Sequence, residues 1–276
     1  MDNKNNILLV DPEFDPKTAA NCTLLLKIMP DSFSYAIIDK SSEKLQAVYD
    51  QQECDDVADT LAEKLKQDVY LSLPFKEIKA AVYTENAIAI PNELFDPADL
   101  NKYNNFFSTP QSGNLYTQPF ASFGFTSIFT LQEFTETTLV SALENCRLYA
   151  QNASILGLAK NKLHAALILD FTATSFNAAY IKDGQLIFQN FYQTDNSEEF
   201  NYYLLLILNR LAIRPTETTA FLSGIIHEGD PNYQCIAKYF DQINFSLPPL
   251  EHTDQKILDD MPAHYYSSLL ALDVCE

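Results

Sequence analysis

Few residues in this chain combine the types and the spacing that catalysis or metal binding requires. The pair His227-Glu228 suggests acid–base or metal chemistry, but it is not part of an H-E-x-x-H motif and the sequence shows no third ligand. The acidic residues Asp259, Asp260 and Glu251 lack the one-three-five spacing of a calcium loop. The G-x-S-x-G sequence of serine hydrolases is absent. We therefore predict no catalytic residue and no metal site.

Glycine is scarce and never clustered. The chain has 6 glycines in 276 residues, and no two are closer together than Gly224 and Gly229. Loops that wrap phosphate need glycines close together, because their backbone N–H groups converge at positive φ without a Cβ in the way. Neither a G-x-G-x-x-G motif nor a P-loop is therefore present.

Charge and cysteine usage restrict partners and compartment. The net charge is −19, and the 18 basic residues are scattered without a run of Lys or Arg. Nucleic acids and anionic membranes both require a basic face, so we predict that neither is a partner. The five cysteines form no C-x-x-C pair, which favours free thiols in a reducing cytoplasm. With no signal peptide and no membrane-spanning segment in the sequence, we expect a cytoplasmic protein.

A repeat relates the two halves of the chain. Ser32-Phe33 matches Ser175-Phe176, and the apolar residues around both pairs match at the same offset (175 − 32 = 143). The offset continues into a following segment, in which Val57, Leu61 and Leu65 match Phe200, Leu204 and Leu208. The repeat is too long for a solenoid unit, whose period is about 50 residues at most. It predicts two similarly folded halves.

Each half is expected to contain a three-stranded antiparallel meander followed by a helix, a strand and a helix. Alternating and apolar stretches predict strands at 24–28, 33–39, 45–49, 80–82, 87–90, 123–129, 165–169, 176–181, 185–191, 219–222 and 243–247. Helices are expected at 54–67, 131–149, 196–211, 231–240 and 264–272. We predict an extended N-terminal arm over 1–20, a first subdomain over 21–160 and a second over 161–276.

Two of these helices carry expectations about packing. The helix over 197–211 is apolar nearly all round, which fits burial in the core or an exposed patch at Tyr202, Leu205 or Leu206 for a partner or a second copy. Acidic residues flank the helix over 264–272, so an anionic bilayer would repel both its ends. We predict that Leu269, Leu270 and Leu272 pack onto the second subdomain instead.

The repeated β-β-β-α-β-α pattern resembles the superfamily of actin, sugar kinases and heat-shock chaperones. The likeness is carried by Leu167 to Asn177, which reads LILDFTATSFN. In that superfamily an Asp ends the first strand of the second-domain hairpin, and glycines and a Thr or Ser follow it and hold the outer phosphates of a nucleotide. The resemblance implies an α/β, duplicated ribonuclease-H-like (actin-like ATPase) fold with two subdomains around a cleft.

The same resemblance identifies the residues that would line a nucleotide cleft, although the glycines are missing. Asp170 and Ser175 are in register with the superfamily motif, but Thr172, Ala173 and Thr174 occupy its glycine positions. In the first half, Lys27 stands where the matching acid would be, before the turn Met29-Pro30-Asp31-Ser32. The adenosine-side motif keeps one glycine. The candidate cleft residues are Asp170, Thr172, Thr174, Ser175, Ser223, Gly224, Asp31 and Ser32.

A closer resemblance is to a bacterial family, domain of unknown function 3822, itself similar to a divergent actin-like ATPase. It rests on Leu186 to Phe191, Glu199 to Tyr203, Leu222 to Gly224 and Tyr233 to Tyr239, and covers about residues 20 to 276. The resemblance supports the fold, and no activity comes with it.

Two hypotheses about function follow. The first is a non-catalytic member of the fold that serves as a cytoplasmic interaction or scaffold protein without a cofactor, with a protein partner or a second copy of itself. The second is an active ATPase or kinase that binds ATP and Mg²⁺ through Asp170 and Ser175. For the first hypothesis, the backbone N–H groups of Thr172 to Thr174 should not converge on one point, because residues with a Cβ disfavour left-handed conformations.

Overall fold

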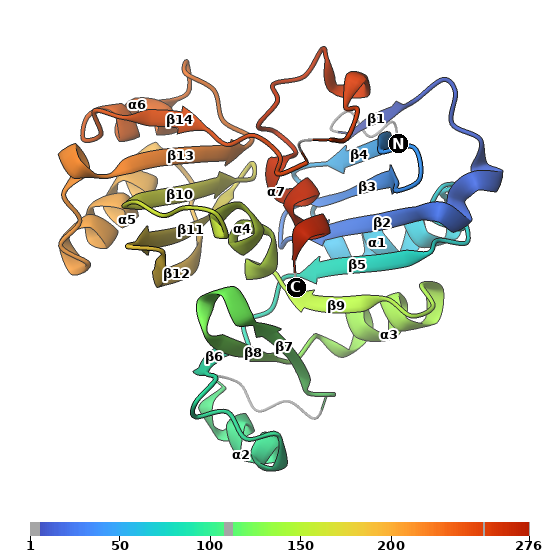
Figure 1. Ribbon diagram of the computed structural model, residues 1–276, viewed down its shortest axis with the longest axis horizontal. Coiled ribbons are helices and arrows are strands. Elements are labelled where there is room, and N and C mark those ends of the chain that lie inside the picture. The colour runs from blue at the N-terminus through green and yellow to red at the C-terminus, as the bar shows by residue number, and fades with distance from the viewer. Residues whose placement is uncertain (1–5, 108–112, 251, 276) are drawn as a thin grey trace. The chain divides into compact units, whose positions relative to one another are not determined.

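The computed structural model describes residues 6–107, 113–250 and 252–275. The chain divides into two compact units, the first over Met1–Ala153 and the second over Ser154–Cys275 (Figure 1). Each unit is built around its own mixed β-sheet.

The sheet of the first unit has the strand order β1-β4-β3-β2-β5-β9. Its strands are β1 (Asn6–Val10), β2 (Cys22–Ile28), β3 (Phe33–Asp39), β4 (Lys44–Gln51), β5 (Glu77–Val82) and β9 (Arg147–Ala150). The first four pair in antiparallel fashion, whereas β5 runs parallel to β2 and β9 runs parallel to β5. Side chains of α1 (Val57–Gln67) and α3 (Glu133–Ala142) share one core with one face of this sheet.

Local sequence explains the start and the buried face of α1. Asp56 is the N-cap, and its Oδ1 accepts a hydrogen bond from Asp59 N at 3.0 Å. Val57, Leu61 and Leu65 recur every four residues, so they lie on one side of the helix and pack into the core.

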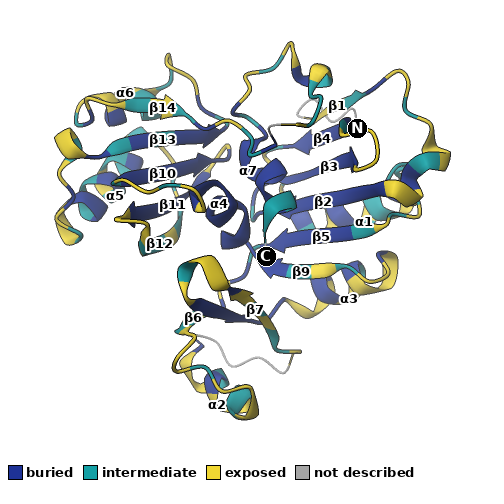
Figure 2. Ribbon diagram, in the orientation of Figure 1, coloured by how far each residue is buried: buried dark blue, intermediate teal, exposed yellow. Residues whose placement is uncertain are grey.

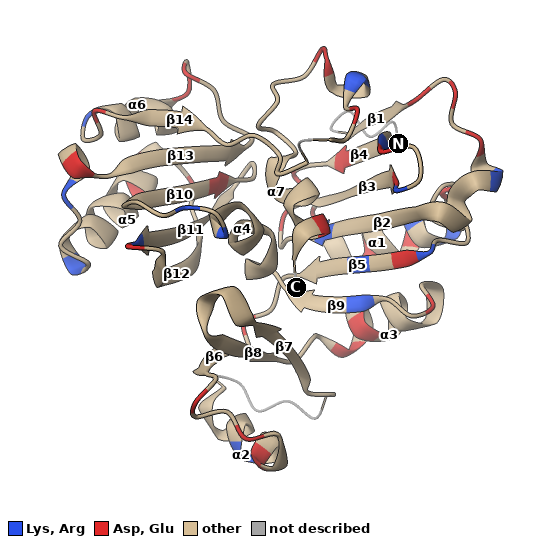
Figure 3. Ribbon diagram, viewed as in Figure 1, with Lys and Arg blue, Asp and Glu red and all other residues tan. Residues whose placement is uncertain are grey.

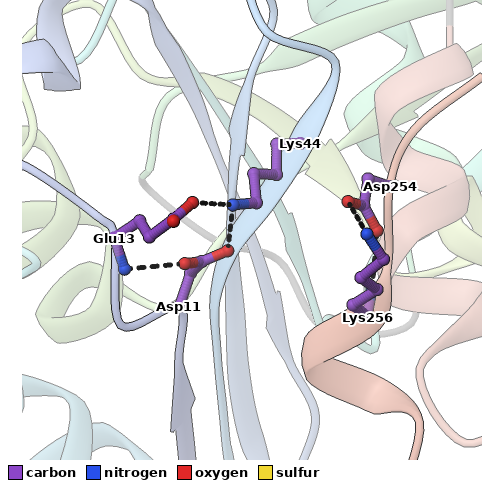
Figure 4. Close-up of polar contacts among 5 residues, drawn as sticks. All are labelled: Asp11, Glu13, Lys44, Asp254 and Lys256. Atoms are coloured by element: carbon purple, nitrogen blue, oxygen red, sulfur yellow. Dashed lines mark hydrogen bonds and ion pairs between the residues drawn. The ribbon is translucent and has the colours of Figure 1, made fainter.

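The N-terminal segment differs from the expected arm, because residues 6–10 form the edge strand β1 of the sheet. The chain that follows β1 is tied to the start of β4. Lys44 Nζ lies 2.7 Å from Asp11 Oδ2 and 3.1 Å from Glu13 Oε2, and Glu13 N donates to Asp11 Oδ1 at 2.8 Å (Figure 4). The hydrogen bonds to Asp11 and Glu13 raise the pKa of Lys44, and the bond to Asp11 has the larger effect.

An insertion between β5 and β9 carries a small three-stranded sheet of order β6-β8-β7. Its elements are β6 (Ala87–Pro91), α2 (Leu100–Tyr103), β7 (Tyr116–Phe120) and β8 (Phe125–Phe129). Tyr103, Phe107 and Ile128 form its own small core. The strand β7 was not expected from the sequence.

The helix predicted over 131–149 is wrong in its second half. The helix α3 ends at Ala142, and the chain re-enters the sheet as β9. Asn145 adopts a φ of +58°, which a continuing right-handed helix does not allow.

The second unit has a sheet of order β12-β11-β10-β13-β14. Its strands are β10 (Ala166–Phe171), β11 (Ser175–Lys182), β12 (Gln185–Gln193), β13 (Thr219–Gly224) and β14 (Ile243–Phe245). Its helices are α5 (Ser197–Arg210), α6 (Pro231–Ala237) and α7 (Ser267–Leu270), and α4 (Asn152–Ala159) begins at the boundary of the two units. The short 3₁₀ helices of the chain are η1 (Pro16–Asn21), η2 (Pro97–Asp99), η3 (Asn104–Phe106), η4 (Ala121–Phe123), η5 (Pro215–Glu217), η6 (Lys256–Leu258) and η7 (Ala271–Val274).

The duplication is confirmed by the pairing of the strands. Ile28 pairs with Phe33 across the first hairpin, and Phe171 pairs with Phe176 across the second, which is the predicted offset (171 − 28 = 143). The irregularity in the next strand pair lies between residues 37 and 38 in one unit and 180 and 181 in the other, again at that offset. The hydrogen bond that closes each turn is also equivalent: Met29 N donates to Ser32 O and Thr172 N to Ser175 O, both at 2.9 Å.

The packing of the two apolar helices follows from their buried faces (Figure 2). The helix α5 buries Phe200, Leu204, Ile207 and Leu208, whereas Tyr202 is 61% exposed. Leu269, Leu270 and Leu272 are buried, and α7 contacts β13, as predicted. None of the helices in the described part of the chain is long and apolar enough to span a bilayer.

Candidate functional site

The candidate residues of the second unit gather where β10 ends. Asp170 lies between Asn177 on β11 and Ser223 on β13, so the three side chains form a row across the sheet. All three are fully or almost fully buried, and Ser223 Oγ donates to Asp170 Oδ1 at 2.9 Å. The Oδ1 atom of Asn177 has no hydrogen-bond partner among the described residues. The aspartate predicted from the sequence is therefore held by its neighbour on the adjacent strand.

The turn after β10 is closed by its own polar groups. The hydroxyl oxygens of Thr172 and Ser175 lie 2.6 Å apart, in addition to the backbone hydrogen bond that joins these residues. Thr194 N donates to Thr174 O at 2.9 Å, which joins the turn to the residue that follows β12. None of the turn residues 172–174 has a positive φ. The turn thus lacks the alternating left-handed conformations that aim successive N–H groups at an anion.

Gly224, at the end of β13, is required by the fold. Its φ is +78°, and a Cβ added there would lie 2.0 Å from Phe171 O. Gly224 N donates to His264 O at 3.0 Å, and His264 Nε2 lies 2.6 Å from Ile226 O. The ring of His264 also stacks on Phe245, with 4.0 Å between centroids. Burial lowers the pKa of His264, which favours the neutral imidazole beside Ile226.

In the first unit, Asp31 and Ser32 lie in the turn between β2 and β3. Both are buried, and Ser32 Oγ donates to Asp31 Oδ1 at 3.2 Å. Cys54 N donates to Asp31 O at 2.9 Å, which ties the turn to the segment before α1. Burial raises the pKa of the Cys54 thiol to about 11, so this cysteine is no reactive thiolate.

Lys27 occupies the position that Asp170 has in the second unit. Lys27, Ser34 and Asp50 are neighbours in the strand register, so they form a row across β2, β3 and β4. Burial is the main cause that raises the pKa of Asp50 to about 6, with Asp31 adding to it, while the hydrogen bond from Gln52 and the charge of Lys27 oppose it. The first unit thus places a buried lysine where the second has a buried acid.

The His227-Glu228 pair lies in a turn in which His227 is engaged with Asp230. His227 Nε2 lies 3.0 Å from Asp230 Oδ1, and His227 N donates to Asp230 Oδ2, so the histidine belongs to a local turn. No group of three or more His, Cys, Asp or Glu side chains among the described residues is arranged to hold a metal ion. Glu251 lies outside the described residues.

A pocket that the sequence did not indicate lies within the first unit. It has a volume of about 250 Å³ and is formed where β2 and β5 end and where α1 and α3 begin. Its lining residues are Ile28, Met29, Pro30, Asp55, Asp56, Val57, Ala58, Val82, Tyr83, Gln132 and Thr135. Four segments far apart in the chain contribute to it, so no single motif could reveal it.

Comparison with solved structures places this architecture in the actin-like ATPase fold. A Bacteroides thetaiotaomicron protein described as having an actin-like ATPase fold and unknown function is 17% identical, with a TM-score of 0.76, 95% of this chain covered and 99% of that one. A chain of the PilM–PilN type IV pilus biogenesis complex gives a TM-score of 0.60 at 12% identity, with 91% and 97% covered. The ethanolamine utilization protein EutJ from Carboxydothermus hydrogenoformans gives 0.52 at 8% identity, with 97% and 93% covered.

The sequence comparisons give the family but no activity. No curated protein matches the chain. The family described as protein of unknown function (DUF3822) matches residues 11–243, which is most of the sequence. The chain therefore belongs to the DUF3822 family.

Proposed function

We propose that this chain is a non-catalytic member of the actin-like ATPase fold that acts as a cytoplasmic protein-interaction or scaffold protein. The observation that carries the proposal is the state of the second-unit turn. Thr172 and Ser175 share a hydrogen bond between their hydroxyls, and Asp170 accepts one from Ser223. The side chains that the fold family would direct at phosphates and Mg²⁺ are thus engaged with each other.

The first-unit turn supports the same proposal. It contains Pro30 and no glycine, and Pro30 has no backbone N–H to offer a phosphate. Lys27, which replaces the matching acid, is buried in the sheet. We conclude that the residues of both turns do not fit ATP and Mg²⁺.

A protein partner fits the remaining features better than other classes. PilM, a protein with this fold, is found in a complex with PilN, so the fold is compatible with protein binding. The chain has a net charge of −19, and its basic residues are dispersed singly (Figure 3). Nucleic acid and anionic lipid would be repelled, because neither meets a basic face.

Nucleotide titration tests the proposal directly. We expect no heat of binding in calorimetry and no rise in melting temperature with ATP and Mg²⁺ at millimolar concentration. A ligand at about 100 times its Kd would stabilise the protein by about 2.7 kcal/mol, which a thermal melt detects readily. A rise of that size that is lost in Asp170→Asn would overturn the proposal in favour of an ATPase or kinase. Asparagine is a better replacement for Asp170 than alanine in this test, because its amide oxygen can still accept the hydrogen bond from Ser223.

A further inference from the structure

We propose that the pocket at the start of α1 and α3 is the docking site for a linear segment of a partner protein, in which an apolar side chain stands next to Lys or Arg. This inference rests on the proposed interaction role and assigns that role a surface. The pocket lies wholly in the first unit, at the carboxyl ends of the parallel strands β2 and β5. Ligands of α/β sheets commonly bind at such strand ends, beside the helices that follow.

The floor of the pocket is apolar and fits a side chain. Ile28, Met29 and Val82 line it and are almost fully buried from solvent. The pocket has a volume of about 250 Å³, which is smaller than the 300–1,000 Å³ that is typical of small-molecule sites. A pocket of this size suits one or two side chains of a peptide, which is the form that interface anchors take.

Polar side chains in the wall add a polar requirement. Thr135 lines the pocket and is only 7% exposed. Gln132, the N-cap of α3, also lines the pocket and makes no side-chain capping hydrogen bond. A hydroxyl and an amide can both exchange hydrogen bonds with an occupant, so one with backbone N–H and C=O groups fits this wall better than a purely apolar one. A peptide has these groups.

The charge of the rim selects a basic occupant. Asp55 and Asp56 line the pocket and are exposed, and Asp59 is exposed in the first turn of α1. None of the three has an ion-pair partner among the residues that the structure describes. Each helix start contributes about half a positive charge, so two starts offset only about one of these carboxylates. The rim remains negative, which favours Lys or Arg in the partner and disfavours an anion.

The test uses a phage-displayed library of random linear peptides selected against the full chain. We expect the enriched peptides to share an apolar residue beside Lys or Arg. The affinity of a synthetic enriched peptide is then measured by fluorescence anisotropy for matched variants. Ala58→Phe, which fills the pocket, should weaken binding by about tenfold or more. Ala62→Phe, one turn further along α1 and outside the lining, should leave the affinity unchanged.

The charge component has its own pair of variants. Asp55→Asn should weaken binding at low ionic strength, and the difference should shrink as salt screens the interaction. Glu63→Gln, which removes an exposed charge elsewhere on α1, should have no effect. Thr135→Val changes the wall without adding bulk, so it tests the pocket even where Ala58→Phe melts early, and it should also weaken binding.

Enriched peptides without a basic residue, or equal affinity for the parent, Ala58→Phe and Thr135→Val, would overturn this inference. The nucleotide titration separates it from the proposed function. Absence of both nucleotide and pocket binding removes only the docking site, whereas nucleotide binding together with pocket binding removes only the non-catalytic role.

Discussion

The hydroxyl of Ser223 donates a hydrogen bond to Oδ1 of Asp170 at 2.9 Å, and both side chains are fully buried. The two residues are direct neighbours on the parallel strands β10 and β13, although they are 53 positions apart in the chain. Burying a carboxylate costs free energy unless it is hydrogen-bonded. The hydrogen bond from Ser223 therefore explains how the fold accommodates an aspartate here without a bound ligand. Asp170 thus joins the two central strands of the second unit.

The first prediction concerns this contact. Asp170→Ala should lower the free energy of unfolding by about 2–4 kcal/mol, because it leaves the Ser223 hydroxyl without its acceptor and opens a cavity. Asp170→Asn should lower it by less, since the amide oxygen can still accept. Denaturant unfolding of the three proteins measures both differences. Equal stability of the alanine variant and the parent would show that the contact contributes nothing.

The second prediction separates two properties of Gly224. Gly184 and Gly224 have similar φ values, +73° and +78°, but only Gly224 has a close neighbour, since a Cβ there would lie 2.0 Å from Phe171 O. Gly184→Ala should lower the free energy of unfolding by about 1 kcal/mol, the order expected for a left-handed residue. Gly224→Ala should lower it by clearly more, because β10 and β13 must also move apart. Thermal melts compare the two, and similar losses would contradict the close approach.

The third prediction follows from His264. Burial holds the pKa of its imidazole below the unfolded value of about 6.5. The unfolded chain therefore binds the proton more readily, so this histidine's contribution is complete above about pH 6.5 and declines as the pH falls below it. His264→Gln, which keeps an N–H donor for Ile226 O but does not titrate in this range, should show a smaller loss of stability between about pH 7.5 and 5.5. An identical pH profile for His264→Gln and the parent would mean that His264 binds protons equally well in the folded and the unfolded chain, so that folding does not lower its pKa.

The sequence predicts those parts of the fold that depend on local pattern. The strands around Ser32-Phe33 and Ser175-Phe176 have alternating or continuous apolar residues. Their shared offset predicts two equivalent hairpins, and the structure has this pairing. The turn Asp183-Gly184 adopts positive φ at both residues, as its dipeptide predicts. The capping residue Asn196 accepts from Glu198 N and Glu199 N at the start of α5.

Other features depend on contacts between distant segments, and the sequence does not reveal them. The strand β9 is short and begins soon after α3 ends, and Asn145 with its positive φ lies at the break between them. Asp170 and Ser175 are identifiable as candidate residues, but the bond from Ser223 that engages Asp170 arises from strand pairing. The pocket at the start of α1 and α3 is lined by four segments that are far apart in the chain.

The last prediction concerns the buried acid of the first unit. Burial raises the pKa of Asp50 to about 6 from 3.8, a difference that corresponds to about 3 kcal/mol. For an acid whose pKa is raised by folding, the folded chain binds the proton more readily. The parent is then most stable below about pH 4 in this respect, and it loses that stability as the pH rises through about 6.

Asp50→Asn removes this charge, so its unfolding free energy relative to the parent should increase between about pH 5 and pH 8, by about 1.4 kcal/mol. The matched control is Asp39→Asn. Asp39 is equally buried, but the hydrogen bonds from Ser41 and Ser42 outweigh its burial and lower its pKa. Because Asp39 is ionised throughout that range in both states, Asp39→Asn should destabilise the protein by the same amount at both pH values. A constant difference for Asp50→Asn as well would show that Asp50 is fully ionised in the fold, with the charge of Lys27 outweighing the effect of burial.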